Sequence, residues 1–186
     1  MPKKSQILKV SSLLAVSVLS LSACTTDGGV SNSKNANSKN ANSKNVNQKG
    51  STMTSPADQY ITVSGAEGSA PTIGAPQGSA PTTLITKDIY TGTGATVLPT
   101  STLTVQYTLL AWSTGKVVES SWNSGSPATF PLAQVIQGWQ EGLAGAKVGT
   151  RRLLIIPPAL GYGANAAGPI KANETLVFVV DILGVK

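Results

Sequence analysis

The chain has 186 residues, a formal net charge of +6 and 12% charged residues, with no histidine and one cysteine. A histidine-dependent catalytic triad, a metal site of histidine and cysteine, and a disulfide within the chain are therefore excluded. Within residues 83–186 the basic residues form no cluster beyond Arg151-Arg152, so the charge pattern of a nucleic-acid-binding protein is absent there. Any reaction that this chain catalyses must therefore proceed without a histidine-activated nucleophile and without a metal. We also expect no cofactor.

The first 23 residues have the organisation of an export signal. Basic lysines come first, an apolar run follows over residues 10–21, and small residues stand at positions 22 and 23. Spanning a bilayer takes about 20 apolar residues, so this run is too short for a transmembrane helix. The order of the three zones predicts a signal peptide over residues 1–23.

The only cysteine stands directly after this signal. The segment Leu21-Ser22-Ala23-Cys24 resembles the lipobox of bacterial lipoproteins, which implies that Cys24 is lipidated, for example with palmitate, and becomes the first residue of the mature protein. The alternative is ordinary secretion with a spare thiol. Two or more acyl chains anchor a protein stably, so we expect a protein held on a bacterial cell membrane, at the outer face or on the periplasmic side.

A low-complexity segment follows over residues 24–82. It is rich in Ser, Asn, Lys, Gly and Ala, and the sequence Gly-Ser-Ala-Pro-Thr occurs at Gly68 and again at Gly78. Such a composition cannot bury a core of its own. We therefore predict a disordered linker over residues 24–82 that joins the lipidated cysteine to one folded domain over residues 83–186.

The folded domain alternates short β-branched runs with turns and contains one helical pattern. Apolar residues recur every three or four positions over residues 132–143, which predicts the single helix, and a glycine-rich loop spans residues 161–168. Strands outnumber helices and their connections are short, so we predict an α+β domain with an antiparallel sheet packed on one short helix. The predicted strands are 84–89, 103–112, 116–120, 129–131, 152–156 and 176–183.

Trp139 would lie between this helix and the sheet. One interpretation is a plain core tryptophan. The other is a concave slot in which Tyr107, Tyr162 and Phe178 surround Trp139, with a few polar groups at its edge.

A motif at the predicted helix favours the slot. The sequence Val-Ile-Gln-Gly-Trp-Gln-Glu-Gly-Leu over residues 135–143 resembles the V-I-x-G-W-x-E-G signature of FK506-binding-type (FKBP-type) peptidyl-prolyl cis-trans isomerases. Further segments agree with that family in order and spacing: residues 105–108, 115–121, 147–151, 161–163 and 175–180.

The resemblance implies a sheet that curls around the helix and a pocket that holds a prolyl ring. It implies that Trp139 is the floor, that the Ile136 N–H binds a ligand carbonyl, and that the Tyr162 hydroxyl binds an amide oxygen. The implied catalytic residues are Tyr107, Glu119, Ile136, Trp139, Tyr162 and Phe178, and the implied substrate-binding residues are Val118, Val135 and Ile170. The implied partners are proline-containing polypeptides and macrolides of the FK506 or rapamycin type.

Several positions depart from the family pattern. Glu119 stands where an aspartate is usual, Val118 replaces a phenylalanine, and Ala128 replaces another frequent aromatic residue. Ala166 and Ala167 stand where some members carry histidine. We expect a wider and less apolar slot. The resulting hypothesis is a peptidyl-prolyl cis-trans isomerase that folds exported proteins, and the alternatives are a chaperone-like module that binds proline peptides with little turnover and a structural or adhesive lipoprotein.

Overall fold

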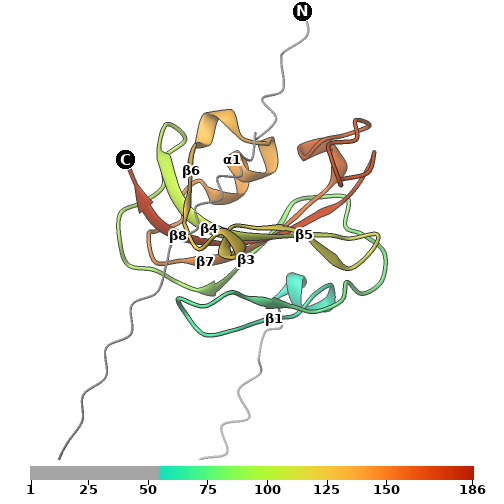
Figure 1. Ribbon diagram of the computed structural model, residues 1–186, viewed down its shortest axis with the longest axis horizontal. Helices are drawn as coiled ribbons and strands as arrows, with labels where there is room; N and C mark the ends of the chain where they lie inside the picture. Colours follow the sequence, from blue (N-terminus) through green and yellow to red (C-terminus); the bar gives the residue numbers. More distant parts are fainter. Residues whose placement is uncertain (1–54) are drawn as a thin grey trace, which may run out of the picture. The chain divides into compact units, whose positions relative to one another are not determined.

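The structure is a computed structural model that describes residues 55–186 (Figure 1). The predicted signal peptide and Cys24 lie outside the described residues. The described residues form one compact unit. No helix within the described part is long and apolar enough to cross a membrane.

The central feature is a six-stranded sheet whose order is β3-β7-β8-β4-β5, with β6 also paired to β4. Every pairing is antiparallel, which confirms the predicted fold class. The strands are β3 (Ile85–Tyr90), β4 (Thr102–Ala111), β5 (Lys116–Ser120), β6 (Ala128–Pro131), β7 (Arg151–Ile156) and β8 (Leu176–Val185).

Strand β4 organises the part of the sheet that carries the predicted site. Along one edge it pairs with β8 over most of its length. Along the other edge its first half pairs with β6 and its second half pairs with β5, so that Thr104 faces Thr129 and Leu109 faces Glu119. The chain between β5 and β6 forms the short helix η2 (Ser121–Ser124). Strands β5 and β6 thereby lie one after the other along the same edge of β4.

The single α-helix, α1 (Gln137–Leu143), packs against one face of the sheet, here called the inner face (Figure 1). The predicted helix over residues 132–143 is wrong in its first half, because η3 (Leu132–Gln134) is followed by extended backbone at Val135 and Ile136. Two consecutive β-branched residues have low helix propensity. The Gln140 side chain also donates to the Val135 carbonyl at 2.7 Å, which holds the chain at the helix start.

A close approach fixes α1 on the sheet. A Cβ added to Gly138 would lie 2.4 Å from a methyl carbon of Ile156, and one added to Gly142 would lie 2.6 Å from Leu154. Both glycines are buried, so the helix backbone contacts β7 directly. Larger residues would push the helix away from the sheet.

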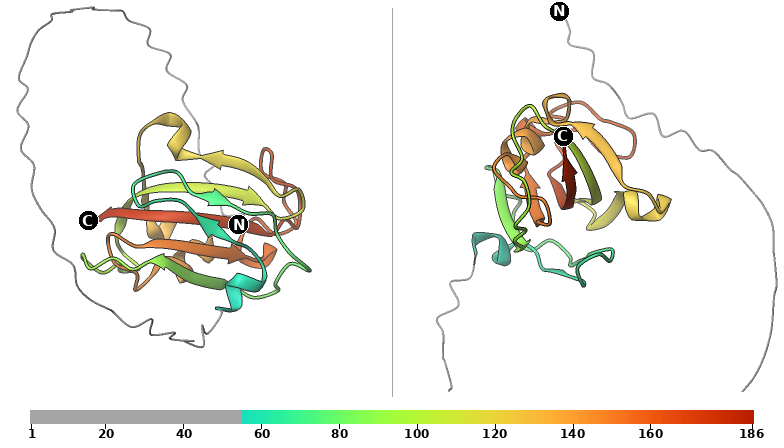
Figure 2. Two further views of the ribbon diagram at one scale, coloured as in Figure 1. Left: turned by 90° about the horizontal axis from the view of Figure 1, so that it is seen from below. Right: turned by 90° about the vertical axis from the view of Figure 1, so that its left-hand side faces the viewer.

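The opposite, outer face of the sheet is covered by residues 55–81, here called the arm, which contains η1 (Pro56–Gln59), β1 (Val63–Ser64) and β2 (Thr72–Ile73). Figure 2 shows the arm, in turquoise, lying across the strands. The prediction that the linker extends to residue 82 is wrong for this part. Its few apolar residues, with Ala57 and Ile61 buried, pack on a sheet face that the arm covers.

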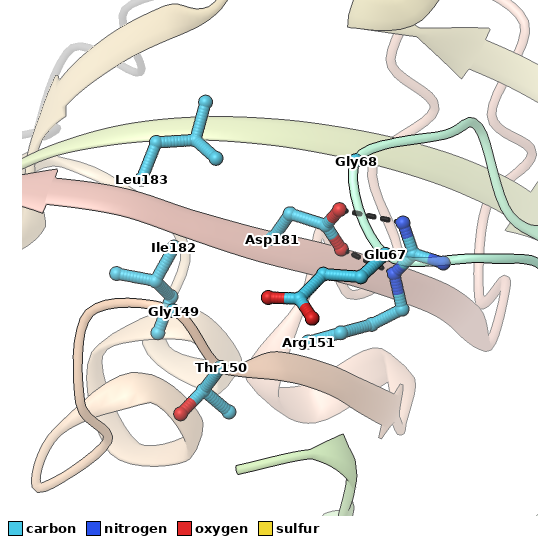
Figure 3. Close-up of a pocket in the computed structure, with 8 residues that line it drawn as sticks. All are labelled: Glu67, Gly68, Gly149, Thr150, Arg151, Asp181, Ile182 and Leu183. Atoms are coloured by element: carbon cyan, nitrogen blue, oxygen red, sulfur yellow. Dashed lines mark hydrogen bonds and ion pairs between the residues drawn. The ribbon is translucent and has the colours of Figure 1, made fainter. Parts of the chain in front are cut away.

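A buried arginine joins the arm to the sheet. The guanidinium of Arg151, only 2% exposed, donates to both carboxylate oxygens of Asp181 at 2.5 and 2.6 Å. It also donates to the carbonyls of Gly65 and Ala66 at 3.3 Å and of Ser69 at 2.6 Å. Beside this network lies a cavity of about 150 Å³ between the arm and the ends of β7 and β8 (Figure 3).

Candidate active site

Four aromatic side chains from four segments converge between the sheet and α1. The Trp139 ring lies 5.3 Å from Phe178, 5.7 Å from Tyr107 and 5.9 Å from Phe130, measured between ring centroids. All three contacts are edge-to-face, a favourable arrangement for aromatic rings. Because these rings come from α1, β4, β6 and β8, the antiparallel register of the sheet is what assembles the cluster.

The predicted residues separate into a buried floor and a half-buried rim. The floor consists of residues that keep only a small exposed area, namely Trp139 (4%), Phe178 (5%), Tyr107 (6%) and Ile170 (6%). The rim consists of residues that are half-buried, namely Val118, Glu119, Val135, Ile136 and Tyr162. The apolar rim side chains and Tyr162 pack against the same core cluster as Trp139, so the structure brings the predicted apolar and aromatic residues together.

The cavity shown in Figure 3 is a separate feature. Its lining consists of Glu67, Gly68, Gly149, Thr150, Arg151, Asp181, Ile182 and Leu183, and none of the predicted site residues is among them. It belongs to the contact between the arm and the sheet.

Polar groups stand at the rim in a defined arrangement. The Tyr107 hydroxyl donates to Glu119 Oε1 at 2.6 Å. Burial raises the pKa of Tyr107, and the hydrogen bond to the Glu119 carboxylate raises it further. Burial also raises the pKa of the Tyr162 phenol, and the negative charge of Glu119 adds to the shift, which places Tyr162 within reach of that charge. Both phenols therefore stay protonated at neutral pH.

Two donors at the site have no partner in the described part of the chain. The Ile136 N–H has no acceptor there, while the Ile136 carbonyl accepts from the Trp139 and Gln140 N–H groups at 3.0 and 3.2 Å. The extended backbone of Ile136 produces this difference, because its carbonyl begins the helix and its N–H lies outside the helical ladder. The buried indole N–H of Trp139 is also without an acceptor.

Phe130 belongs to the aromatic cluster but was not identified from the sequence. It lies at 6.1 Å from Tyr107 and 5.9 Å from Trp139, again between ring centroids. Alternation along β6 was the available signal, because Ala128 and Phe130 are half-buried while Thr129 is exposed. The expectation of a less apolar slot, which rested on Val118 and Ala128, therefore overlooked an aromatic side chain on β6.

This arrangement provides an apolar floor with hydrogen-bond donors around it. No group of three or more potential metal ligands lies among residues 55–186. The site is suited to binding and distorting a peptide without forming a covalent bond.

Comparisons with known proteins agree with this geometry. The pattern of the family described as "FKBP-type peptidyl-prolyl cis-trans isomerase" matches residues 94–183. A probable FK506-binding protein of Corynebacterium glutamicum is 42% identical over 113 residues, which cover 61% of this chain and 96% of that protein. An FK506-binding protein of Streptomyces anulatus is 44% identical over 119 residues, covering 62% and 96%.

Solved structures show the same fold. The crystal structure of FkpA from Escherichia coli has a TM-score of 0.52 and 37% identity, covering 55% of this chain and 48% of that chain. The crystal structure of AtFKBP13 has a TM-score of 0.51 and 30% identity, covering 57% of this chain and 96% of that chain. Since relatives above 40% identity are matched over nearly their whole length, this chain belongs to the FKBP-type peptidyl-prolyl cis-trans isomerase family.

Proposed function

We propose that the chain is a surface lipoprotein whose aromatic site accelerates rotation about X-Pro bonds in exported polypeptides. The observation that carries this proposal is the convergence of Tyr107, Phe130 and Phe178 around Trp139. Beside them, the Ile136 N–H at the rim has no acceptor in the described part of the chain. A pyrrolidine ring is apolar, as is this aromatic floor. Membership of the FKBP-type family indicates that the reaction is peptidyl-prolyl cis-trans isomerisation.

The chemistry needs no covalent step. Rotation about a peptide bond faces a barrier of about 18–20 kcal/mol because resonance keeps the amide planar. Twisting the bond ends this resonance and makes the imide nitrogen pyramidal, so a site that binds the twisted form more tightly than the planar form lowers the barrier. Each tenfold acceleration requires about 1.4 kcal/mol of such differential binding.

We assign roles to the rim on this basis. Trp139 holds the prolyl ring, and the Tyr162 hydroxyl donates to the oxygen of the imide carbonyl, which belongs to the residue before proline. The Ile136 N–H donates to a carbonyl on the other side of the ring. Glu119 accepts from Tyr107 at 2.6 Å and so fixes the phenol that forms one wall. None of these groups has to gain or lose a proton.

The proposed location rests on the sequence. The signal over residues 1–23 and the lipobox-like Cys24 would place the mature chain on a membrane surface, where newly exported polypeptides fold. Isomerisation of proline takes tens of seconds without a catalyst, which is slow enough to limit folding. The segment between Cys24 and Ser55 contains no proline, so this tether offers the chain's own site no X-Pro bond.

A second candidate function is capture of proline-bearing peptides with little turnover. The replacement of aromatic residues by Val118 and Ala128 favours it, because a wider slot would hold the planar and the twisted imide with similar affinity. Relatives named FK506-binding proteins extend the proposed ligands to macrolides of that type.

The experiment is an exchange measurement by NMR on a proline tetrapeptide, using the soluble chain from Thr25 to Lys186. We expect the wild type to accelerate cis-trans exchange. Tyr162→Phe, which removes one hydroxyl, should lower the rate constant by roughly tenfold, as loss of about 1.4 kcal/mol implies. Tyr60→Phe removes the same group from the arm and is the matched control.

The outcomes separate the two candidates. No acceleration by a folded wild-type chain, together with shifts of its site resonances on adding peptide, would reject the enzyme and support the binding module. Equal losses in Tyr162→Phe and Tyr60→Phe would contradict the role given to Tyr162.

A further inference from the structure

We infer that Glu119 gives the site a preference for a basic residue directly before proline and a bias against an acidic one. This inference rests on the proposed function, since it concerns which polypeptides the same site selects. It depends on the bonding, the surroundings and the position of one carboxylate.

Glu119 carries a charge that no cation balances in the described part of the chain. Its Oε1 accepts from Tyr107 at 2.6 Å, and no donor among residues 55–186 reaches its Oε2. The three ion pairs within that range use aspartates only, namely Asp58 with Lys87, Asp88 with Arg152 and Asp181 with Arg151. The free oxygen of Glu119 is thus available to a ligand.

The surroundings of Glu119 are apolar or neutral. The phenols of Tyr107 and Tyr162 both have a raised pKa and carry no charge at neutral pH. The remaining rim residues, such as Val118 and Ile136, are aliphatic. A charge at the edge of an apolar floor interacts more strongly with a partner charge than it would in bulk water. A cation brought by the substrate would therefore meet an unbalanced acceptor.

The position of Glu119 selects the residue before proline. Glu119 accepts from the Tyr107 hydroxyl at 2.6 Å, and Tyr162 packs against the same core cluster as Tyr107, so the carboxylate lies on the side of the site where Tyr162 stands. In the proposed complex the Tyr162 hydroxyl binds the imide oxygen, and that oxygen belongs to the residue before proline. The side chain of this residue consequently starts beside Glu119, and a lysine or arginine is long enough to reach the carboxylate. The residue after proline lies toward Ile136 instead.

The experiment compares three peptides, acetyl-Ala-X-Pro-Ala-amide with X as Lys, Gln or Glu, by NMR exchange on the Thr25 to Lys186 chain. Two unit charges about 4 Å apart in water interact by about 1 kcal/mol, so we expect kcat/KM for the Lys peptide to exceed that for the Gln peptide by roughly three- to tenfold, and kcat/KM for the Glu peptide to lie below that for the Gln peptide by a similar factor. The Gln peptide should fall between them.

Two variants test the assignment to Glu119. Glu119→Gln keeps the side chain's shape and an oxygen for Tyr107, so it should bring the three peptides within about twofold of one another while the chain stays folded. Glu141→Gln removes an equal charge from the exposed face of α1, where Glu141 accepts from Gln137 at 2.6 Å. It should leave the wild-type ratio unchanged.

Salt gives a readout that needs no variant. Raising the ionic strength from about 0.01 M to about 1 M shortens the screening length from roughly 30 to 3 Å, so the Lys-to-Glu ratio of the wild type should fall toward one. A wild-type chain that accelerates all three peptides equally at low salt would overturn the inference and leave the proposed function standing. Failure to accelerate any of them would reject both.

Discussion

The arm makes a testable contribution to stability through Ile61. Its side chain is 2% exposed and packs against the outer face of the sheet, in one cluster with Leu110, Ile155 and Val177. We predict that Ile61→Ala destabilises the fold, because the truncation removes apolar contacts and leaves a cavity between the arm and the sheet.

The size of the effect follows from burial. Truncating a fully buried isoleucine to alanine costs about 2–5 kcal/mol, against a total stability of about 5–15 kcal/mol for a domain. The largest loss of stability that Ile61→Ala can cause depends on how the arm unfolds. If the arm can detach while the sheet stays folded, the loss cannot exceed the free energy with which the arm docks. A loss of about 3 kcal/mol would therefore mean that the arm docks on the sheet with at least that free energy.

The assay is urea unfolding followed by circular dichroism. We expect a single transition whose midpoint falls while its slope stays the same, since the slope reports the surface exposed on unfolding. Ile73→Ala is the matched control, because Ile73 lies in the same arm but is only half-buried, and its loss should be smaller. The isomerase rate at 25 °C should stay within about twofold, since none of the predicted site residues lies in the arm.

Two results would refute this reasoning. An unchanged midpoint would mean that the arm does not pack on the sheet in solution. A strong loss of isomerase rate in a chain that is still folded would mean that the arm acts on the site on the other face.

Two further predictions concern charge and protonation. Asp181→Asn leaves the buried guanidinium of Arg151, 2% exposed, without its carboxylate. The free energy of unfolding, measured in urea, should fall by about 3–5 kcal/mol. A fall below about 1 kcal/mol would show that the arm carbonyls alone are enough to stabilise the buried guanidinium. Burial, followed by the effects of Glu119, raises the pKa of Tyr107 and Tyr162 above the ordinary 10.0. Above pH 10 the unfolded chain therefore binds fewer protons than the folded one, so the stability contributed by these phenols is complete below pH 10 and is lost as the pH rises through the folded pKa values. Absorbance of phenolate should show Tyr107 and Tyr162 ionising late, and ionisation of these two near pH 10 would contradict the packing.

Much of the inner half of the fold was predictable from the sequence. Strand β5 has the predicted bounds, β7 starts one residue earlier than predicted, and β4 is shifted by one residue at each end, because β-branched runs bounded by turn residues leave few alternatives. The aromatic cluster was predictable from a motif around Trp139 whose helical spacing set that residue toward the sheet.

The parts that were not predictable depend on long-range contacts. The arm looked like linker because Ile61 and Ile73 lie in polar, glycine-rich surroundings and acquire a core only from the sheet face on which they pack. The late start of α1 was not predictable because Val135 and Ile136 fit the apolar spacing of a helix even though their backbone is extended. Phe130 was missed since a four-residue strand gives too short an alternation to stand out.

The central claim is that a prolyl ring rests on the indole of Trp139. The chain has three tryptophans, and each gives one indole N–H signal in a ¹⁵N correlation spectrum. The account predicts that adding a proline peptide shifts the signal of Trp139, assigned through Trp139→Phe, while the signal of Trp112, which packs with the outer-face cluster, stays in place. A titration that moves Trp112 and leaves Trp139 unchanged would contradict the account.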